Sequence, residues 1–382
     1  MNNFIQSLKN RNLLHQSTFK SIIPNDITTI YGGFDPTAKS LHVGNALLLM
    51  ALFRGQIHGL NSIYLVGGAT GLIGDPSFKD KERPELSIEN VYENTKYIMN
   101  QIKQWIHNAK EFSSMRGINT PGKELILNNA DWLGKISFID FLKRVGKHSK
   151  VSIMLQRECV KKRMEREESI SYTEFTYQLL QGYDYHYLYK NYNCTLQIGG
   201  SDQLGNMIAG IDLIHRVERF DSPVFAATLP LLTNDQGKKY GKSEGNAIWL
   251  DETLCSPFDF YQFFLNSTDS LLERLLFSFT FLDAAEIAEI LNEHEKNPEK
   301  RIGQIELASH VTELFHGSLK KAHTMTQLCF GSKDSFPSSS SLMDAFVGSS
   351  NFHSINQSNC GKSKVADILA LVGICKSKSK TI

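Results

Sequence analysis

Short runs of β-branched and aromatic residues alternate with segments of helical apolar spacing over the first 250 residues. Runs bounded by Gly, Pro, Asn or Asp predict strands, and an apolar period near 3.6 predicts helices. The predicted strands are residues 28–31, 61–66, 124–128, 195–198 and 224–227. The predicted helices are residues 45–58, 87–107, 138–146, 152–167, 172–182 and 203–219. This alternation predicts an α/β fold with a largely parallel sheet covered by helices.

The pattern changes twice further along the chain. After residue 257 the strand signals end, and helical spacing over residues 258–266, 271–279, 284–294 and 303–315 predicts a small all-α domain. Beyond residue 331 the chain is rich in Ser, which is typical of a linker. We therefore predict domains at residues 1–250 and 251–330, a linker over 331–360 and a short C-terminal piece, 361–382.

Composition narrows the classes of protein. Apolar residues make up 41% of the 382 residues, and no apolar run is long enough to span a bilayer. The net charge is +1, so any contact with nucleic acid has to come from local patches. Six scattered Cys residues without a CxxC pair predict neither a metal site nor a disulfide framework, and they suit a reducing compartment.

The first residues allow two interpretations. They hold no acidic residue before Asp26, but they carry Lys9, Arg11 and Lys20, as a mitochondrial transit segment does. An ordinary first helix over residues 3–15 explains the same stretch, and we favour it.

Two glycine-rich segments follow predicted strands. The first reads YGGFDPTAKSLHVGN at residues 31–45, where a strand, a Gly pair and a helix start succeed one another. Amides at a helix N-terminus attract phosphate, and Thr37 and His42 add donors there. The second reads GGATGLIGDPS at residues 67–77, a small-residue loop in which Asp75 suits an ammonium group. Taken alone, each segment is more simply explained by a turn with a capping Asp.

Three polar groupings complete the candidate chemistry. Tyr177, Gln181 and Asp184 lie at i, i+4 and i+7, on one helix face that is too polar for ordinary core packing. The segment QIGGSDQ at residues 197–203 places Asp202 either on a ribose or at a helix cap. KYGKS at residues 239–243 reads as a phosphate clamp on a glycine-hinged loop, although alone it is an ordinary basic turn.

These segments, in this order, resemble the class I aminoacyl-tRNA synthetases. HVGN and KYGKS resemble the family signatures HIGH and KMSKS, and the middle segments resemble the amino-acid pocket of the tyrosine–tRNA ligases. The resemblance runs from about residue 4 to residue 317 and includes SPFDFYQFFLN at residues 256–266. It implies a Rossmann-like catalytic domain, an anticodon-binding helical domain and, at residues 361–382, the incomplete start of an RNA-binding module.

The resemblance also implies a role for each site residue. The tyrosine-binding residues would be Tyr31, Asp75, Tyr177, Gln181, Asp184, Gln197 and Gln203. The ATP-binding residues would be Asp35, Thr37, His42, Gly44, Asn45, Asp202 and Lys242. The pyrophosphate clamp would comprise Lys79, Arg83, Lys239, Lys242 and Ser243, and the tRNA contacts His215 and Arg216.

The implied activity is ATP-dependent activation of tyrosine and its transfer to the 3′ end of tRNA(Tyr). Mg²⁺ would accompany the ATP, without a prosthetic group or a dedicated protein metal site. The family implies a homodimer, and likeness to the bacterial type favours mitochondria, with a bacterial cytoplasm as the alternative. A non-catalytic RNA-binding protein on the same scaffold is the second hypothesis. A tryptophan ligase fits less well, because an indole offers no hydroxyl to Tyr31 and Asp184.

Overall fold

The computed structural model describes residues 3–19, 27–77, 86–165, 170–233, 240, 242–243, 246–331 and 337–346. Internal contacts divide the chain into two compact units, residues 1–318 and 319–382. The functional boundaries at residues 250, 330 and 360 stay predictions. Among the helices described, none combines the length and the apolar character needed to cross a bilayer.

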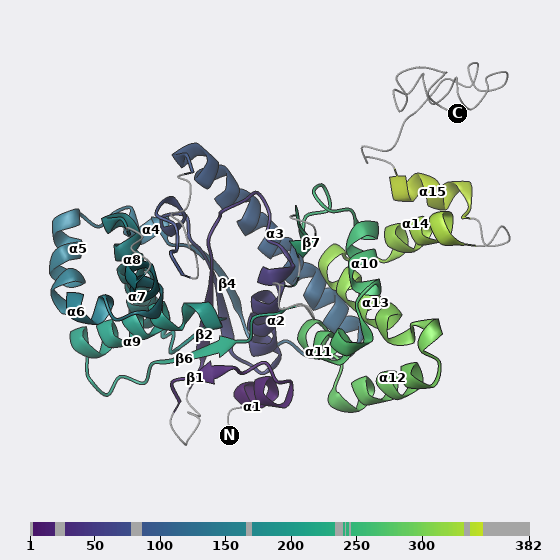
Figure 1. The fold of residues 1–382 in the computed structure, drawn as a ribbon, viewed down its shortest axis with the longest axis horizontal. Coiled ribbons are helices and arrows are strands. Elements are labelled where there is room, and N and C mark those ends of the chain that lie inside the picture. Colours follow the sequence, from purple (N-terminus) through teal and green to yellow (C-terminus); the bar gives the residue numbers. More distant parts are fainter. Residues whose placement is uncertain are drawn as a thin grey trace, which may run out of the picture. The chain divides into compact units, whose positions relative to one another are not determined.

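The first unit is built on one mixed sheet (Figure 1). Its strands are β1 (Gln16–Ser17), β2 (Thr29–Phe34), β3 (Asn61–Val66), β4 (Glu124–Asn128), β5 (Leu196–Gly200) and β6 (Phe225–Leu229). The strand order is β1-β6-β5-β2-β3-β4, and every pair is parallel except the antiparallel edge pair β1–β6. The predicted parallel sheet is therefore confirmed. The chain runs outward from β2 to β4 on one side and from β5 to β6 on the other, so the switch point lies between β2 and β5.

Helices cover the two faces of this sheet. Helices α2 (Val43–Ile57) and α3 (Ile88–Met115) lie on one face, and α9 (Leu204–Val217) lies on the other (Figure 1). The faces differ because crossovers between parallel strands are right-handed and the two halves of the sheet are built in opposite directions. Helix α9 packs on α8 (Tyr172–Tyr192). The shorter elements of this region are α1 (Asn3–Asn10), η1 (Thr70–Leu72), α4 (Ala130–Leu133), α5 (Phe138–Arg144), η2 (Gly146–His148), α6 (Val151–Met154), α7 (Glu158–Glu165) and η3 (Ser201–Gln203).

Several helix limits differ from those predicted. Helix α3 continues to Met115 instead of residue 107, because Phe112 extends its buried face. Helix α8 continues ten residues beyond Gly182, to a left-handed Asn193 with φ of 50°. The single helix predicted at 152–167 is two, α6 and α7, and the first helix ends at Asn10 instead of residue 15. These errors share a cause: tertiary packing, which local patterns do not contain, decides where a helix ends.

The four helices predicted after residue 257 are confirmed. They are α10 (Pro257–Leu265), α11 (Asp269–Phe279), α12 (Ala284–Lys296) and α13 (Ile302–His316), with η4 (Pro298–Lys300) before the last. The Ser256 hydroxyl caps α10 by accepting from Asp259 N at 3.1 Å. Helix α13 packs on α10 and also on α3, so this helical region shares one compact unit with the sheet.

The second unit contains α14 (Lys320–Phe330) and α15 (Ser339–Phe346), which contact each other. Helix α15 lies where Ser-rich composition predicted a linker. The Ser338 hydroxyl accepts from Ser341 N at 3.2 Å, so a residue typical of linkers acts here as a helix cap. The module predicted at residues 361–382 lies outside the described residues.

Candidate active site

The carboxyl edge of the sheet gathers the segments singled out from the sequence. β2, β3 and β4 end in one row, since Phe34 pairs with Val66 and Val66 with Asn128. Asp35 and Asn129 are therefore the first residues beyond two strands of that row. Open α/β sheets bind ligands at this edge, beside the switch point.

Tyr31 and Gln197 stand side by side across the switch point, because they are register partners on β2 and β5. Their exposed fractions are 1% and 3%. Within the described part of the chain, neither the Tyr31 hydroxyl nor Gln197 Oε1 has a hydrogen-bond partner. Buried polar atoms are normally paired, so two such atoms at one place point to a polar ligand.

Asp184 of α8 is a buried acceptor close to this pair. Its carboxylate accepts from Trp132 Nε1 at 2.7 Å and from Asn129 Nδ2 at 2.9 Å. Burial raises its pKa to about 7, against the lowering effect of these two hydrogen bonds. Burial first, and then the charge of Asp184, raise the pKa of the Tyr31 hydroxyl well above its ordinary value. Tyr31 and Asp184 together can therefore accommodate the neutral hydroxyl of a phenol.

The sequence interpretation missed Asn129 and Trp132. Asn129 donates also to Thr70 Oγ1 at 3.0 Å and accepts from Ala69 N at 2.8 Å, so it joins the glycine-rich loop to Asp184. The Trp132 indole stacks on Tyr187, with ring centroids 4.3 Å apart. Their position just after a predicted parallel strand was a usable signal, because that is where such sheets carry ligands.

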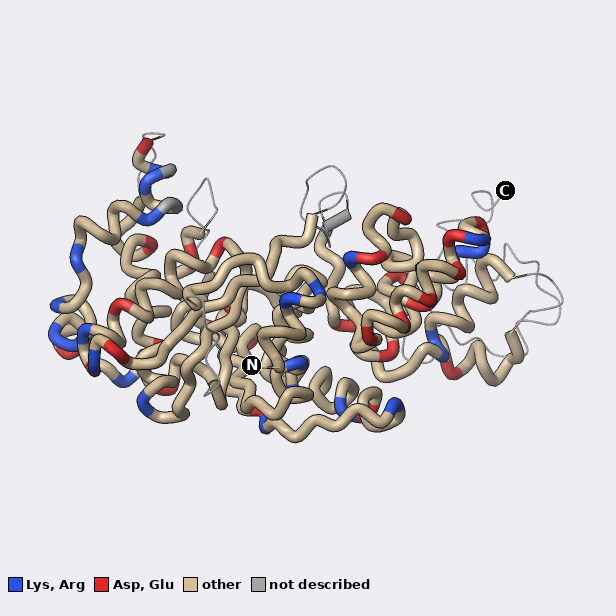
Figure 2. The backbone as a smooth tube through the Cα atoms, turned by 90° about the horizontal axis from the view of Figure 1, so that it is seen from below, with Lys and Arg blue, Asp and Glu red and all other residues tan. Residues whose placement is uncertain are grey.

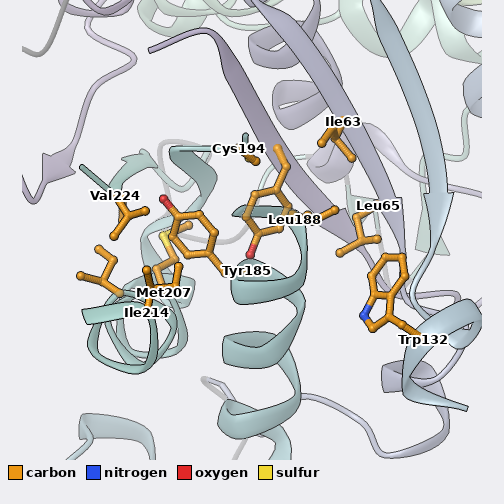
Figure 3. Packing of buried hydrophobic residues seen from close by; sticks show 12 residues of the cluster. Ile63, Leu65, Trp132, Tyr185, Leu188, Cys194, Met207, Ile214 and Val224 are labelled. Atoms are coloured by element: carbon orange, nitrogen blue, oxygen red, sulfur yellow. The ribbon is translucent and has the colours of Figure 1, made fainter. Parts of the chain in front are cut away.

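Helix α8 is held firmly against the sheet beside Asp184. The Tyr185 hydroxyl donates to the carbonyls of Thr195 at 2.8 Å and Phe225 at 2.7 Å, at the starts of β5 and β6. Tyr185 and Leu188 of α8 lie in one cluster with residues of α9 and the sheet (Figure 3). The predicted polar stripe therefore sits on a rigid element.

A second part of the site is strongly acidic. The Tyr177 hydroxyl donates to Asp35 Oδ2 at 2.7 Å, and Thr70 Oγ1 donates to Asp35 Oδ1 at 2.8 Å. Burial raises the pKa of Tyr177 well above its ordinary value, and the charges of Asp35, Asp75 and Asp184 raise it further. The negative charge near this hydroxyl makes this part of the site favourable for a cationic group.

Asp75 organises the neighbouring loop. It accepts from Ser77 N at 2.9 Å and from Gln203 Nε2 at 2.7 Å, while Asn206 Nδ2 lies 3.4 Å from it. Gln181 Oε1 is buried without a hydrogen-bond partner among the described residues. The residues predicted to hold an ammonium group are thus brought together by the fold.

Gly67 allows this network to close. A Cβ at this position would stand 2.1 Å from Asp35 Oδ1 and 2.3 Å from Thr70 Oγ1. Any side chain would push the Asp35 carboxylate away from Thr70. The glycine of this loop is therefore required for close approach of backbone and carboxylate.

The start of α2 carries the predicted phosphate-facing residues. The His42 N–H donates to Asn45 Oδ1 at 3.1 Å, so the Asn45 oxygen contributes to the cap of its own helix. A Cβ on Gly44 would stand 2.8 Å from the His42 ring, so glycine lets that ring lie over the first turn. Thr37 is exposed nearby, and its N–H donates a hydrogen bond to the Asp35 carbonyl at 2.9 Å.

The second signature is fixed beside the first. Lys242 and Ser243 form β7 (Lys242–Ser243), which pairs with β8 (Asn246–Ala247). The next residues return along the first signature, where Val43 N donates to the Ile248 carbonyl at 2.9 Å. Tyr240, two residues before β7, shares a 2.8 Å hydroxyl hydrogen bond with Ser267. The residues that follow β8 thus connect this hairpin to the segment that begins α2, about 200 residues earlier in the sequence.

The other residues that the sequence predicted for the site lie in different parts of the chain. Asp202 lies in η3, at the carboxyl end of β5. His215 and Arg216 lie near the far end of α9, about 17 Å along the helix from its start. His215 Nε2 lies 3.0 Å from the Ser222 carbonyl, and Arg216 donates to the His148 carbonyl. Lys79, Arg83 and Lys239 lie outside the described residues.

The chain is similar to known proteins over most of its length. The family model of class I tRNA synthetases for tryptophan and tyrosine matches residues 24–329. The tyrosine–tRNA ligase of Streptococcus agalactiae is 43% identical over 382 residues, covering 98% of this chain and 87% of that protein. The mitochondrial tyrosine–tRNA ligase of Drosophila melanogaster is 45% identical over 315 residues, covering 81% of this chain and 68% of that protein.

The fold agrees as well. A C-terminally truncated mitochondrial tyrosyl-tRNA synthetase from Aspergillus nidulans superposes with a TM-score of 0.75 at 33% identity, over 82% of this chain and 90% of that one. The likeness therefore includes both the sheet and the helical region that packs on it. The chain belongs to the tyrosine–tRNA ligases of class I, enzymes that activate tyrosine with ATP and transfer it to tRNA.

Proposed function

We propose that Tyr31 and Asp184 read the phenol hydroxyl of the substrate tyrosine. The substrate hydroxyl donates to the Asp184 carboxylate and accepts from Tyr31, whose hydroxyl has no partner in the described residues. Two buried donors, Asn129 and Trp132, already hold Asp184 in place. With phenylalanine bound, the Tyr31 hydroxyl would have no partner and Asp184 would lose its contact with the substrate, and that loss is costly in a buried site.

The ammonium and carboxylate ends of tyrosine go to the acidic part of the site. Asp75, Tyr177 and Gln181 hold the ammonium group, and Gln197 and Gln203 orient the substrate. The support is the burial of Asp75, Tyr177 and Gln197, the buried oxygen Oε1 of Gln181, and the Gln203–Asp75 hydrogen bond. This leaves the tyrosine carboxylate directed toward the segment that begins α2.

ATP lies along the two signatures in this proposal. Asp35, Thr37, His42, Gly44 and Asn45 face its phosphates and ribose, and Asp202 accepts from a ribose hydroxyl. One tyrosine carboxylate oxygen bonds to the α-phosphorus, and the bond from that phosphorus to the bridging oxygen breaks. The electron pair leaves with pyrophosphate, whose charge Lys79, Arg83, Lys239, Lys242 and Ser243 stabilise. Mg²⁺ arrives with ATP, without a prosthetic group, and among the described residues no cluster of three His, Cys, Asp or Glu could hold a metal ion.

The proposed phenol contact makes tyrosine binding depend on pH. Since the pKa of Asp184 is about 7, acidification protonates the acceptor of the substrate hydroxyl. We expect the tyrosine Kd to rise by up to about tenfold per pH unit below 7 and to level off above it. Equilibrium dialysis between pH 5.5 and 8 measures this.

The stability of the free enzyme should change with pH in the opposite direction to tyrosine affinity, so that it falls as the pH rises. The folded-state pKa of Asp184 lies above the ordinary value of 3.8, so the folded protein binds this proton more tightly than the unfolded chain. Its stabilising contribution is complete below about pH 4 and is lost as pH rises through about 7. Asp184→Asn should flatten both pH profiles. A profile unchanged in that variant would assign the titration to another group.

The tRNA would approach along a basic surface. Residues 135–165 carry nine Lys and Arg against three Asp and Glu, in a chain whose net charge is only +1. Figure 2 shows Lys and Arg gathered over α5 to α7, at the left of the view. Arg216 contacts His148 within this region, which supports the assignment of His215 and Arg216 to tRNA.

We propose that the protein forms a homodimer through helix α5 and the next helix in the sequence, α6. Helix α5 contains no buried residue, and its apolar side chains Phe138 and Ile139 are 65% and 63% exposed. Leu142 of α5, Val151 of α6 and Leu155 just after α6 are also 38%, 59% and 38% exposed. Exposed apolar side chains gathered on two successive helices are typical of an interaction site, and a second copy is the partner that the family implies.

The dimer is tested with Ile139→Asp. We expect the dissociation constant of the dimer to rise at least about a hundredfold, because a charge would be buried at the interface. Analytical ultracentrifugation measures it. Phe220→Asp is the matched control, since Phe220 is 88% exposed but lies outside this surface. An Ile139→Asp protein as dimeric as the control would place the interface elsewhere.

For the compartment we propose the mitochondrial matrix, with a bacterial cytoplasm as the alternative. Support comes from the mitochondrial relatives: the Drosophila enzyme is about as similar to this chain as the bacterial one, and the Aspergillus enzyme is 33% identical. Import of the full chain into isolated mitochondria is the direct test. The non-catalytic RNA-binding alternative is not favoured, because the relatives are ligases and the tyrosine pocket residues are brought together.

A further inference from the structure

The segment from Leu41 to Val43 joins the two signatures. The Leu41 carbonyl accepts from Leu250 N at 2.9 Å, and Val43 N donates to the Ile248 carbonyl at 2.9 Å. The β7–β8 hairpin, which includes Lys242, directly precedes residues 248–250 in the sequence. Where the main chain of Leu41 lies therefore determines where the lysine hairpin stands relative to His42.

The side chain of Gln101, on helix α3, also holds the main chain of Leu41. Gln101 of α3 accepts from Leu41 N at 2.8 Å through Oε1 and donates from Nε2 to Ser40 Oγ at 3.0 Å. The Ser40 hydroxyl in turn donates to the Leu41 carbonyl at 2.7 Å. Two turns earlier on the same helix, Asn94 donates to the Pro36 carbonyl at 3.1 Å.

These hydrogen bonds cannot be replaced easily. Ser40 is 4% and Leu41 2% exposed, so water would not readily reach the amide and hydroxyl that Gln101 satisfies. A buried donor without a partner costs its full desolvation penalty, and the segment would move to recover one. A single amide that both accepts and donates also fixes the register of the segment, not only its distance from α3.

We propose that Gln101 is a positioning residue for the formation of tyrosyl-adenylate. It touches neither substrate; it holds Leu41 so that the hairpin carrying Lys242 stands in register with His42 across the phosphates of ATP. This inference rests on the proposed placement of phosphates between the two signatures. The tyrosine pocket is held by α8 and Asn129 instead, so loss of Gln101 slows the step that forms pyrophosphate and leaves tyrosine binding intact.

The test compares Gln101→Met with Gln104→Met. Met is close in length to Gln but lacks the amide, and Gln104 on the exposed side of the same helix also makes one side-chain hydrogen bond, to Asn108 at 2.9 Å. In single-turnover assays, Gln101→Met should form tyrosyl-adenylate at least about tenfold more slowly. Its tyrosine Kd should stay within about twofold of the parent, and Gln104→Met should change neither quantity.

Two further readouts separate positioning from general destabilisation. Gln101→Glu keeps an acceptor for Leu41 N, so it should recover most of the rate. Amide hydrogen exchange at residues 246–250 should speed up in Gln101→Met and not in Gln104→Met, since the strand pairing there loosens. An unchanged adenylate rate in Gln101→Met, or an equal loss of tyrosine affinity, overturns the proposal.

His42→Ala distinguishes failure of this inference from failure of the site assignment. If His42→Ala slows adenylate formation and Gln101→Met does not, the phosphate site stands and the positioning role is wrong. If neither variant slows it, the placement of the phosphates at His42 is wrong as well.

Discussion

Asp184→Ala should lower kcat/KM for tyrosine in ATP–pyrophosphate exchange by roughly 10²–10³-fold. The substrate hydroxyl would lose its carboxylate acceptor in a buried site. Asn129 and Trp132 would also lose the acceptor of hydrogen bonds that are 2.9 and 2.7 Å long. The fold should persist, because α8 stays anchored through Tyr185 to Thr195 and Phe225.

Asp212→Ala is the matched control for this experiment. Asp212 also lies on a helix of the first unit, but its side chain is 40% exposed and pairs with Arg157 at 3.3 Å. Exchange by the control should equal that of the parent. Discrimination against phenylalanine should also fall in Asp184→Ala, since the variant no longer loses an acceptor when the hydroxyl is absent. Undiminished exchange with tyrosine would show that the pocket is assigned to the wrong residues.

Much of this site was accessible from sequence, for a physical reason. A parallel sheet collects ligand-binding residues at one edge, so Asp35, Asp75 and Asp202 could be grouped once the strands before them were recognised. The stripe of Tyr177, Gln181 and Asp184 follows from helical geometry alone. Predictions of this kind depend on local periodicity, and the structure confirms the elements on which they rest.

Other features depend on contacts between distant segments and could not be predicted in this way. The position of Asn129 and Trp132 after a predicted strand could have marked them as candidates, but their hydrogen bonds to Asp184 depend on the strand order and on where α8 packs. Gln101 of α3 accepts from Leu41 N, 60 residues earlier in the sequence, and no local pattern indicates that contact. Helix limits were wrong for the same reason, since packing partners extend α3 and α8 beyond their local patterns.

Lys242→Ala should slow formation of tyrosyl-adenylate by roughly 10²–10³-fold and change tyrosine affinity little. The main chain of Lys242 lies in β7, and the residues after β8 pair with the first signature, which begins α2. In the proposed placement of ATP, a lysine at this place acts on the departing pyrophosphate and belongs to a different segment from the tyrosine pocket. It should therefore act on charge that develops in the transition state.

Single-turnover adenylate formation and equilibrium dialysis with tyrosine measure the two quantities separately. Lys103→Ala, an exposed lysine of α3, controls for the loss of one positive charge. High salt should not reproduce the effect of Lys242→Ala, because salt weakens exposed charges far more than a charge enclosed with its substrate. Equal losses in rate and tyrosine affinity would mean that Lys242 binds the ground state, and the clamp would then have to be assigned to Lys239 or to Lys79 and Arg83.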